Sequence, residues 1–144
     1  MHINNAVKVY EIMEKFRRNM IGKKIASDIP RSEFALLKLV QTSRTKGEDV
    51  TISYISDHLE ISRSAVSQMI NHLEEKGYIE RISTKNDRRL VYVRLTKGGE
   101  GFIAERYQKF LQSMTKIFNR MGEKDTEELL RLLEKLYDIV NDNA

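Results

Sequence analysis

The sequence of 144 residues contains no cysteine. This absence excludes disulfide bonds, thiolate metal ligands, a nucleophilic cysteine and thiol-based redox sensing. The three histidines, His2, His58 and His72, lie far apart in the sequence and form no HxxxH or HExxH motif. Because scattered histidines are more often surface or helix-packing residues than ligands, we expect neither a metal ion nor another cofactor.

Long apolar runs are missing as well. No stretch approaches the roughly 18 consecutive apolar residues that a membrane-spanning helix needs. The N-terminal segment carries acidic and basic side chains throughout, unlike the uninterrupted apolar centre of a signal peptide. We therefore expect a cytoplasmic protein without membrane association, formed by a single domain over residues 1–144.

The sequence also lacks the patterns of an enzyme. It has no glycine-rich phosphate loop and no nucleophile elbow. Its adjacent acid pairs, Glu74-Glu75 and Glu127-Glu128, diverge by about 100° on a helix, so neither pair can act as a joint acid and base. We therefore predict a protein that is not an enzyme.

Charge is distributed unevenly along the chain, whose formal net charge is +4. Residues 62–97 hold eight basic and four acidic side chains, whereas residues 123–144 hold three basic and seven acidic ones. A negatively charged partner should therefore meet residues 62–97, and the acidic C-terminal segment should face away from it.

The spacing of apolar residues predicts a mainly α-helical fold with six helices and a small antiparallel wing of two or three strands. The helices are expected at 3–20, from 32 to the loop 43–49, at 52–59, 62–76 and 97–121, and from 123 onward, and the strands at 78–84 and 90–96.

Capping residues mark several of these boundaries. Ser32, Thr51, Ser62 and Thr96 suit N-cap positions, and Gly77 suits a left-handed stop. A short helix, a tight connection and a second helix with a polar outer face form a helix-turn-helix arrangement.

The helix that begins after Ser62 has two distinct faces. At about 100° per residue, four apolar residues fall on one side and four short or amide side chains fall opposite. A merely solvated face would usually be rich in Lys and Glu, whereas uncharged donors and acceptors suit base edges in a DNA major groove. The apolar residues are Val66, Met69, Ile70 and Leu73, and the polar ones are Ser64, Ser67, Gln68 and Asn71.

The turn between the two predicted strands is polar and carries three cations, Lys85, Arg88 and Arg89. It has nothing apolar to bury, so a phosphate backbone or a minor groove would suit it.

The predicted terminal helices carry apolar residues on more than one side, among them Val9, Phe16 and Phe118. Pairing with a second copy of the chain would bury that surface. The alternative is that these apolar residues form part of the protein's own core, which is the usual role of an apolar helix face.

These motifs together resemble the MarR family of winged helix-turn-helix transcriptional regulators. Asp87-Arg88-Arg89, Val93, Leu95-Thr96 and Gly99 match the family's DRRxxxVxLTxxG wing signature without a departure. Upstream, SRSAVSQMINHLEEKGYIER resembles the family's recognition helix and first wing strand. The order of elements covers essentially the whole chain, but only residues 51–99 match specifically.

The resemblance implies a homodimer on double-stranded DNA, with a palindromic operator. Residues 31–97 would form the DNA-binding lobe, and 1–30 and 98–144 the helical dimerisation region. Each recognition helix would enter a major groove and each wing a minor groove. By position, the resemblance implies groove contacts for Ser64, Ser67, Gln68 and Asn71. At the start of the helix it implies phosphate contacts for Ser62 and Arg63. In the wing, Asp87 and Arg89 would shape the turn, and Arg88 and Lys85 would contact DNA.

Family members often release DNA when a small aromatic or anionic effector enters a crevice beside the DNA-binding lobe. Tyr10, Phe16, Phe34 and His58 lie on segments that could line such a crevice, but each has an equally good core or surface role. A sequence-specific regulator, most often a repressor in this family, is therefore our main hypothesis. A nonspecific architectural DNA-binding protein is the alternative, and the sequence determines neither the operator nor the regulated genes nor an effector.

Overall fold

The computed structural model describes residues 2–19, 29–83 and 90–142 of the chain. The chain divides into two compact units, Met1–Glu105 and Arg106–Ala144, and the second unit begins inside a long helix. Each unit is described by itself. Among the described residues no helix is both long enough and apolar enough to cross a bilayer.

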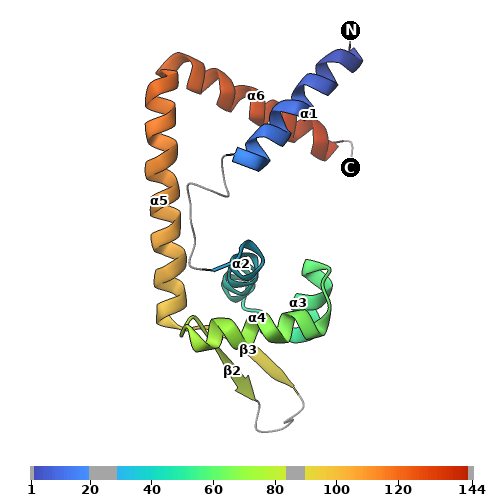
Figure 1. The fold of residues 1–144 in the computed structure, drawn as a ribbon, viewed down its shortest axis with the longest axis vertical. Helices are drawn as coiled ribbons and strands as arrows, with labels where there is room; N and C mark the ends of the chain where they lie inside the picture. The colour runs from blue at the N-terminus through green and yellow to red at the C-terminus, as the bar shows by residue number, and fades with distance from the viewer. Residues whose placement is uncertain (1, 20–28, 84–89, 143–144) are drawn as a thin grey trace. The chain divides into compact units, whose positions relative to one another are not determined.

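The described part of the chain contains six helices and three strands, and Figure 1 labels the helices and the strands β2 and β3. This confirms the predicted mainly α-helical winged fold and fixes the number of strands at three. The helices are α1 (His2–Asn19), α2 (Arg31–Thr45), α3 (Ile52–Leu59), α4 (Arg63–Glu75), α5 (Lys97–Met121) and α6 (Glu123–Asp142), and the strands are β1 (Val50–Thr51), β2 (Ile79–Ser83) and β3 (Val91–Leu95).

The sheet has the order β1-β3-β2, with both pairs antiparallel. In its register Arg81 lies opposite Val93, and Val50 lies opposite the same residue from the other side. The central strand β3 is therefore paired with a strand on both edges, and this pairing holds the base of the wing in place. The sequence did not locate β1, because two residues are too few to show an alternating pattern.

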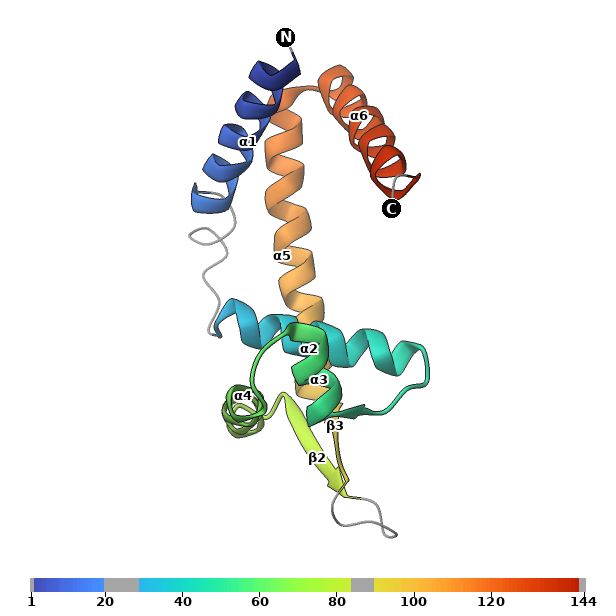
Figure 2. The same ribbon diagram turned by 90° about the vertical axis from the view of Figure 1, so that its right-hand side faces the viewer.

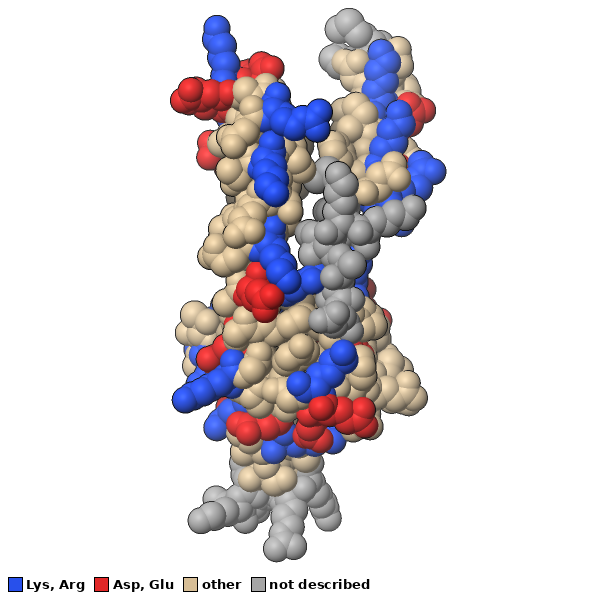
Figure 3. All heavy atoms as spheres, turned by 60° about the vertical axis from the view of Figure 1, so that its left-hand side comes forward, with Lys and Arg blue, Asp and Glu red and all other residues tan. Residues whose placement is uncertain are grey.

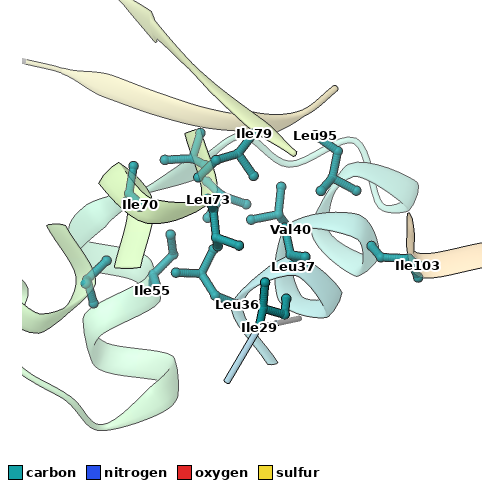
Figure 4. Close-up of a cluster of buried hydrophobic side chains, with 13 residues drawn as sticks. Ile29, Leu36, Leu37, Val40, Ile55, Ile70, Leu73, Ile79, Leu95 and Ile103 are labelled. Carbon is teal, nitrogen blue, oxygen red and sulfur yellow. The ribbon is translucent and has the colours of Figure 1, made fainter. Parts of the chain in front are cut away.

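The core of the first unit is formed where α2, α3 and α4 meet one face of the sheet and the first turns of α5. In Figure 4 the side chains of this cluster point toward one another from these elements. The residues with no exposed surface are Leu36, Leu37, Ile55, Val66, Ile70 and Leu73. Three of these six belong to α4, so this helix is anchored in the core.

Two predicted N-caps are confirmed in the HTH segment and one is wrong at the start of α2. The hydroxyl of Thr51 accepts a hydrogen bond from the Tyr54 N–H, and that of Ser62 accepts one from the Ala65 N–H, both at 3.1 Å. Helix α2 instead begins at Arg31, with Pro30 in the N-cap position and no side-chain cap. Ser32 therefore lies inside the first turn, where proline's fixed φ angle has already set the direction of the chain.

The end of α2 also differs from the prediction, since the helix continues to Thr45 through part of the expected loop 43–49. The hydroxyls of Thr42 and Thr45 donate hydrogen bonds to carbonyls four residues earlier, at 2.9 and 3.1 Å. These local bonds satisfy polar side chains within the helix, so a polar stretch did not mark a helix end here.

Thr96 joins three elements of the first unit. Its hydroxyl accepts a hydrogen bond from the Gly99 N–H at 3.1 Å, as the predicted cap of α5, and donates one to the carbonyl of Gly77. A Cβ atom at Gly99 would lie 2.0 Å from the carbonyl oxygen of Tyr78. Only glycine therefore allows the start of α5 to approach Tyr78, the residue before β2, this closely.

The terminal helices lack such anchoring within their own units. In α1, all described side chains from Ile3 to Asn19 are exposed except the half-buried Glu14. Helix α6 is described from Glu123 to Asp142, and none of these residues is buried. Its Arg131 hydrogen-bonds Glu128 and thereby lowers the pKa of the Glu128 carboxyl. The large apolar side chains exposed on α6 are Leu130, Leu132, Leu133, Leu136, Tyr137, Ile139 and Val140.

Candidate nucleic-acid interface

Helix α4 lies at the edge of the lobe and follows α3 through a tight turn. Glu60 ends α3 in a left-handed conformation, with φ of 56°, and Ser62 caps α4 two residues later. In Figure 2 α4 is seen end-on, with α3 and the sheet on one side of it. The opposite side of α4 is thus available to a ligand of the lobe.

The four predicted groove-facing residues lie on this outer side. Ser64, Gln68 and Asn71 are exposed and Ser67 is half-buried. Ser62 and Arg63 are exposed at the start of the helix, where backbone N–H groups and the helix dipole favour an anion. The structure therefore places five residues of the predicted interface on α4 and Ser62 at its N-cap, and their roles stay predictions.

A partly buried contact that the sequence did not reveal holds the flank of α4 nearest α2. Nδ1 of His72 lies 2.7 and 2.8 Å from the two carboxylate oxygens of Glu33 on α2. Glu33 is 6% exposed, so its carboxylate depends on this partner. The two residues are 39 positions apart, so no local pattern could have paired them.

The opposite flank of α4 is held by Arg81 of β2. One guanidinium nitrogen donates to Oδ1 of Asn71 at 2.6 Å, and another donates to Oε1 of Glu74 at 3.2 Å. Sequence analysis placed Arg81 in a wing strand but gave it no role. Alternation along the strand was the available signal, because it places Arg81 on the same face as the buried Ile79, which faces α4.

The predicted wing contacts cannot be placed. Lys85, Asp87, Arg88 and Arg89 all lie outside the described residues, so their roles stay predictions. On the face drawn in Figure 3 basic and acidic side chains lie interspersed. Three of the eight basic side chains of residues 62–97 belong to this tip, so the described residues include only part of the predicted cationic surface.

The residues considered for an effector crevice have separate environments. Phe34 packs edge-on against Phe102, with ring centroids 6.2 Å apart, and His58 stacks on Tyr54 at 5.6 Å. Tyr10 and Phe16 are exposed on α1. A hollow of about 510 Å³ lies between α2, β3 and the start of α5, but its Arg44 is already paired with Glu100 at 2.7 Å.

The arrangement of α2, α3, α4 and the β-hairpin defines a winged helix-turn-helix protein. Residues 27–90 match the sequence model of the MarR family. In this part of its sequence, and in its fold, the chain is similar to proteins of this family. The match includes α2, the helix-turn-helix segment and β2, which form most of the DNA-binding lobe expected from the sequence.

Known proteins of this kind resemble the chain over much of its length. It is 33% identical over 86 residues to an uncharacterized HTH-type transcriptional regulator, YwhA, of Bacillus subtilis, covering 60% of this chain and 62% of that protein. It is 24% identical over 105 residues to the transcriptional repressor MprA of Escherichia coli, covering 73% and 60%. Both matches span less than two thirds of the relative.

A solved structure covers the chain more completely. The structure of FabT from Streptococcus pneumoniae in complex with DNA is 26% identical and covers 99% of this chain and 95% of that one, with a TM-score of 0.56. The resemblance thus includes the terminal helices, which the family's sequence model does not reach.

Proposed function

We propose that this protein is a sequence-specific DNA-binding transcriptional regulator that acts as a repressor. The observation that carries the proposal is the outer face of α4, where uncharged donors and acceptors are displayed on a helix anchored in the core. Side chains of this type match the donor and acceptor pattern of base edges in the major groove. The DNA complex of FabT and the name of the repressor MprA support this assignment.

In this proposal residues 31–97 form the DNA-binding lobe. Helix α4 enters the major groove, and Ser62 and Arg63 meet phosphate. The wing is shaped by Asp87 and Arg89 and brings Arg88 and Lys85 to the backbone or an adjacent minor groove. One copy of the chain then reads one half of a palindromic operator.

In this proposal the protein binds its palindromic operator as a homodimer. Residues 1–30 and 98–144 supply its interface, because α1 and α6 each expose apolar side chains that their own units leave uncovered. Exposed apolar surface of this extent is a common sign of an interaction site. Light scattering at micromolar concentration should give twice the mass of the 16.9 kDa chain, and the mass of a single chain would refute the dimer.

Release of DNA on binding of a small ligand is included in the proposal only because members of the MarR family often behave in this way. Such an effector would have to bind the released state more tightly than the DNA-bound state. Its chemistry would be aromatic or anionic, by analogy with other members.

The alternative is a nonspecific architectural DNA-binding protein. Backbone binding would call for cations on the outer face of α4, where the protein has serine and amide side chains. A gel-shift titration against the DNA that flanks the gene, with random duplex as competitor, separates the two functions. Repression requires a clear preference for the flanking DNA, and equal affinity for both duplexes would favour the architectural role. A panel of aromatic acids in the same titration tests ligand release.

A further inference from the structure

The side-chain amide of Asn71 is held from the sheet side of α4. Arg81 donates a hydrogen bond of 2.6 Å to Oδ1 of Asn71, and its other arm reaches Glu74, one helical turn further along, at 3.2 Å. The guanidinium therefore bridges two side chains on the same flank of the helix. It is also partly shielded, since the Arg81 side chain is 33% exposed.

The position of Arg81 follows from the sheet. Its cross-strand partner Val93 and its neighbour Ile79 are both buried on the face that packs against the helices. Alternation along β2 puts Arg81 on that same face, just beyond the apolar core. From there the side chain extends along the flank of α4 to Asn71 and Glu74.

The chemistry of arginine determines which end of the amide it meets. A guanidinium has only N–H donors, so the atom that faces it must be the oxygen of Asn71 and not its NH₂ group. An amide could otherwise be turned either way. With Oδ1 bonded to Arg81, the NH₂ group is the part of the exposed Asn71 amide that is left for a partner outside the protein.

We propose that Arg81 is a positioning residue that makes Asn71 a hydrogen-bond donor toward the major groove. This inference rests on the proposed function and specifies which base edge Asn71 reads. Guanine presents two acceptors, N7 and O6, whereas adenine presents the N7 acceptor beside an N6 donor. An amide whose oxygen is already bonded to Arg81 presents mainly its N–H donors and therefore favours guanine over adenine, unlike a freely turning asparagine, which can pair with adenine through both its groups.

The test is a selection from a random duplex library with the full-length protein. Asn71→Ala identifies the operator position that Asn71 reads, and the wild type should prefer guanine there. Arg81→Ala should lower the preference for guanine over adenine at that same position roughly tenfold, within the range expected for one side chain on a base. Arg81→Lys should lie between the two, since an ammonium cannot hold both partners with fixed fork geometry.

Arg94→Ala is the matched control. Arg94 lies on the neighbouring strand and pairs with Asp49 at 3.3 Å, but the buried residues on either side of it place it on the opposite face of the sheet. Its removal should leave the preference at every position unchanged. Substitution of 7-deazaguanine at the Asn71 position should weaken binding of the wild type and leave Asn71→Ala unaffected.

The outcomes separate the inference from the function on which it rests. If the wild type selects an operator but Arg81→Ala and Arg81→Lys weaken all sequences equally, Arg81 has a structural or backbone role and the inference is wrong. It is also wrong if they change a position other than the one that Asn71→Ala changes, or if adenine is preferred at that position. A wild type that binds every duplex alike overturns the proposed function, and the positioning role with it.

Discussion

Helices α4 and α6 are both amphipathic, yet they use their apolar residues differently. In α4, Val66, Ile70 and Leu73 are fully buried within one copy of the chain. In α6, Leu133 is 51% exposed and Leu136 is 56% exposed. Amphipathic spacing alone therefore does not say what covers the apolar face. Helix α4 is anchored by its own chain, whereas the apolar face of α6 is left exposed by its own chain.

Leu73→Ala should give the largest effect. The side chain has no exposed surface, so its truncation leaves a cavity and should lower the free energy of unfolding by about 3 kcal/mol. Urea denaturation followed by circular dichroism measures the loss. A loss below about 1 kcal/mol would contradict the anchoring of α4 in the core.

Gly99→Ala should destabilise the lobe by about 2 to 3 kcal/mol, because the added methyl group would collide with the carbonyl of Tyr78. Gly101→Ala is the control, since a Cβ atom there meets nothing within 4 Å. In the same helix it should be neutral or stabilising by up to about 1 kcal/mol. Thermal unfolding of both variants tests the close approach of α5 to β2, and equal effects would refute it.

His72→Phe should destabilise the protein by about 2 kcal/mol, because the carboxylate of Glu33 would remain buried without its partner. His58→Phe serves as the control, since His58 is exposed and only stacks on Tyr54. The double substitution Glu33→Leu with His72→Phe should recover much of the loss, because the charge is then removed as well. Chemical denaturation provides all three values.

Leu133→Ala tests whether the exposed apolar face of α6 lies in a dimer interface. If a second copy covers α6, truncation should weaken dimerisation roughly tenfold, in keeping with about 1.5 kcal/mol for the lost apolar burial. Analytical ultracentrifugation over a range of concentrations measures the dissociation constant. An unchanged constant would show that Leu133 lies outside the interface.

Arg88→Ala should have the smallest effect, and it should be the same for all DNA sequences. Loss of one phosphate contact weakens specific and random duplex alike and lowers the salt slope by about one unit. Binding at roughly 50 and 200 mM salt reveals this change. Unchanged affinity at both concentrations would count against the wing assignment, while Arg94→Ala should leave the slope as it is.

The outline of the fold was predictable because its signals are local. Thr51 and Ser62 cap their helices through bonds to residues three positions away, and Gly77 has a positive φ angle of 78°. Such features depend on short-range sterics and hydrogen bonding, which a sequence displays directly. Ser32 was misassigned because the fixed φ angle of Pro30 began the helix before it.

The candidate interface was predictable in its composition but not in its supports. Helical periodicity separated Ser64, Gln68 and Asn71 from the core side of α4. It could not show that Arg81 would approach Asn71, or that Glu33 would approach His72, because these contacts depend on how separate elements pack. The wing tip stays a prediction, since residues 84–89 lie outside the described residues.

The sequence by itself determined the helix-turn-helix segment, the polar outer face of α4 and the resemblance to the MarR family, since each depends on residues that are near one another in the chain. Only the tertiary structure decided how that face is held, with Glu33 on one flank and Arg81 on the other. The physical reason is that hydrogen bonds fix a side chain through its partners in space. Asn71 appears in the sequence as an amide that could turn either way, and the fold gives it one direction.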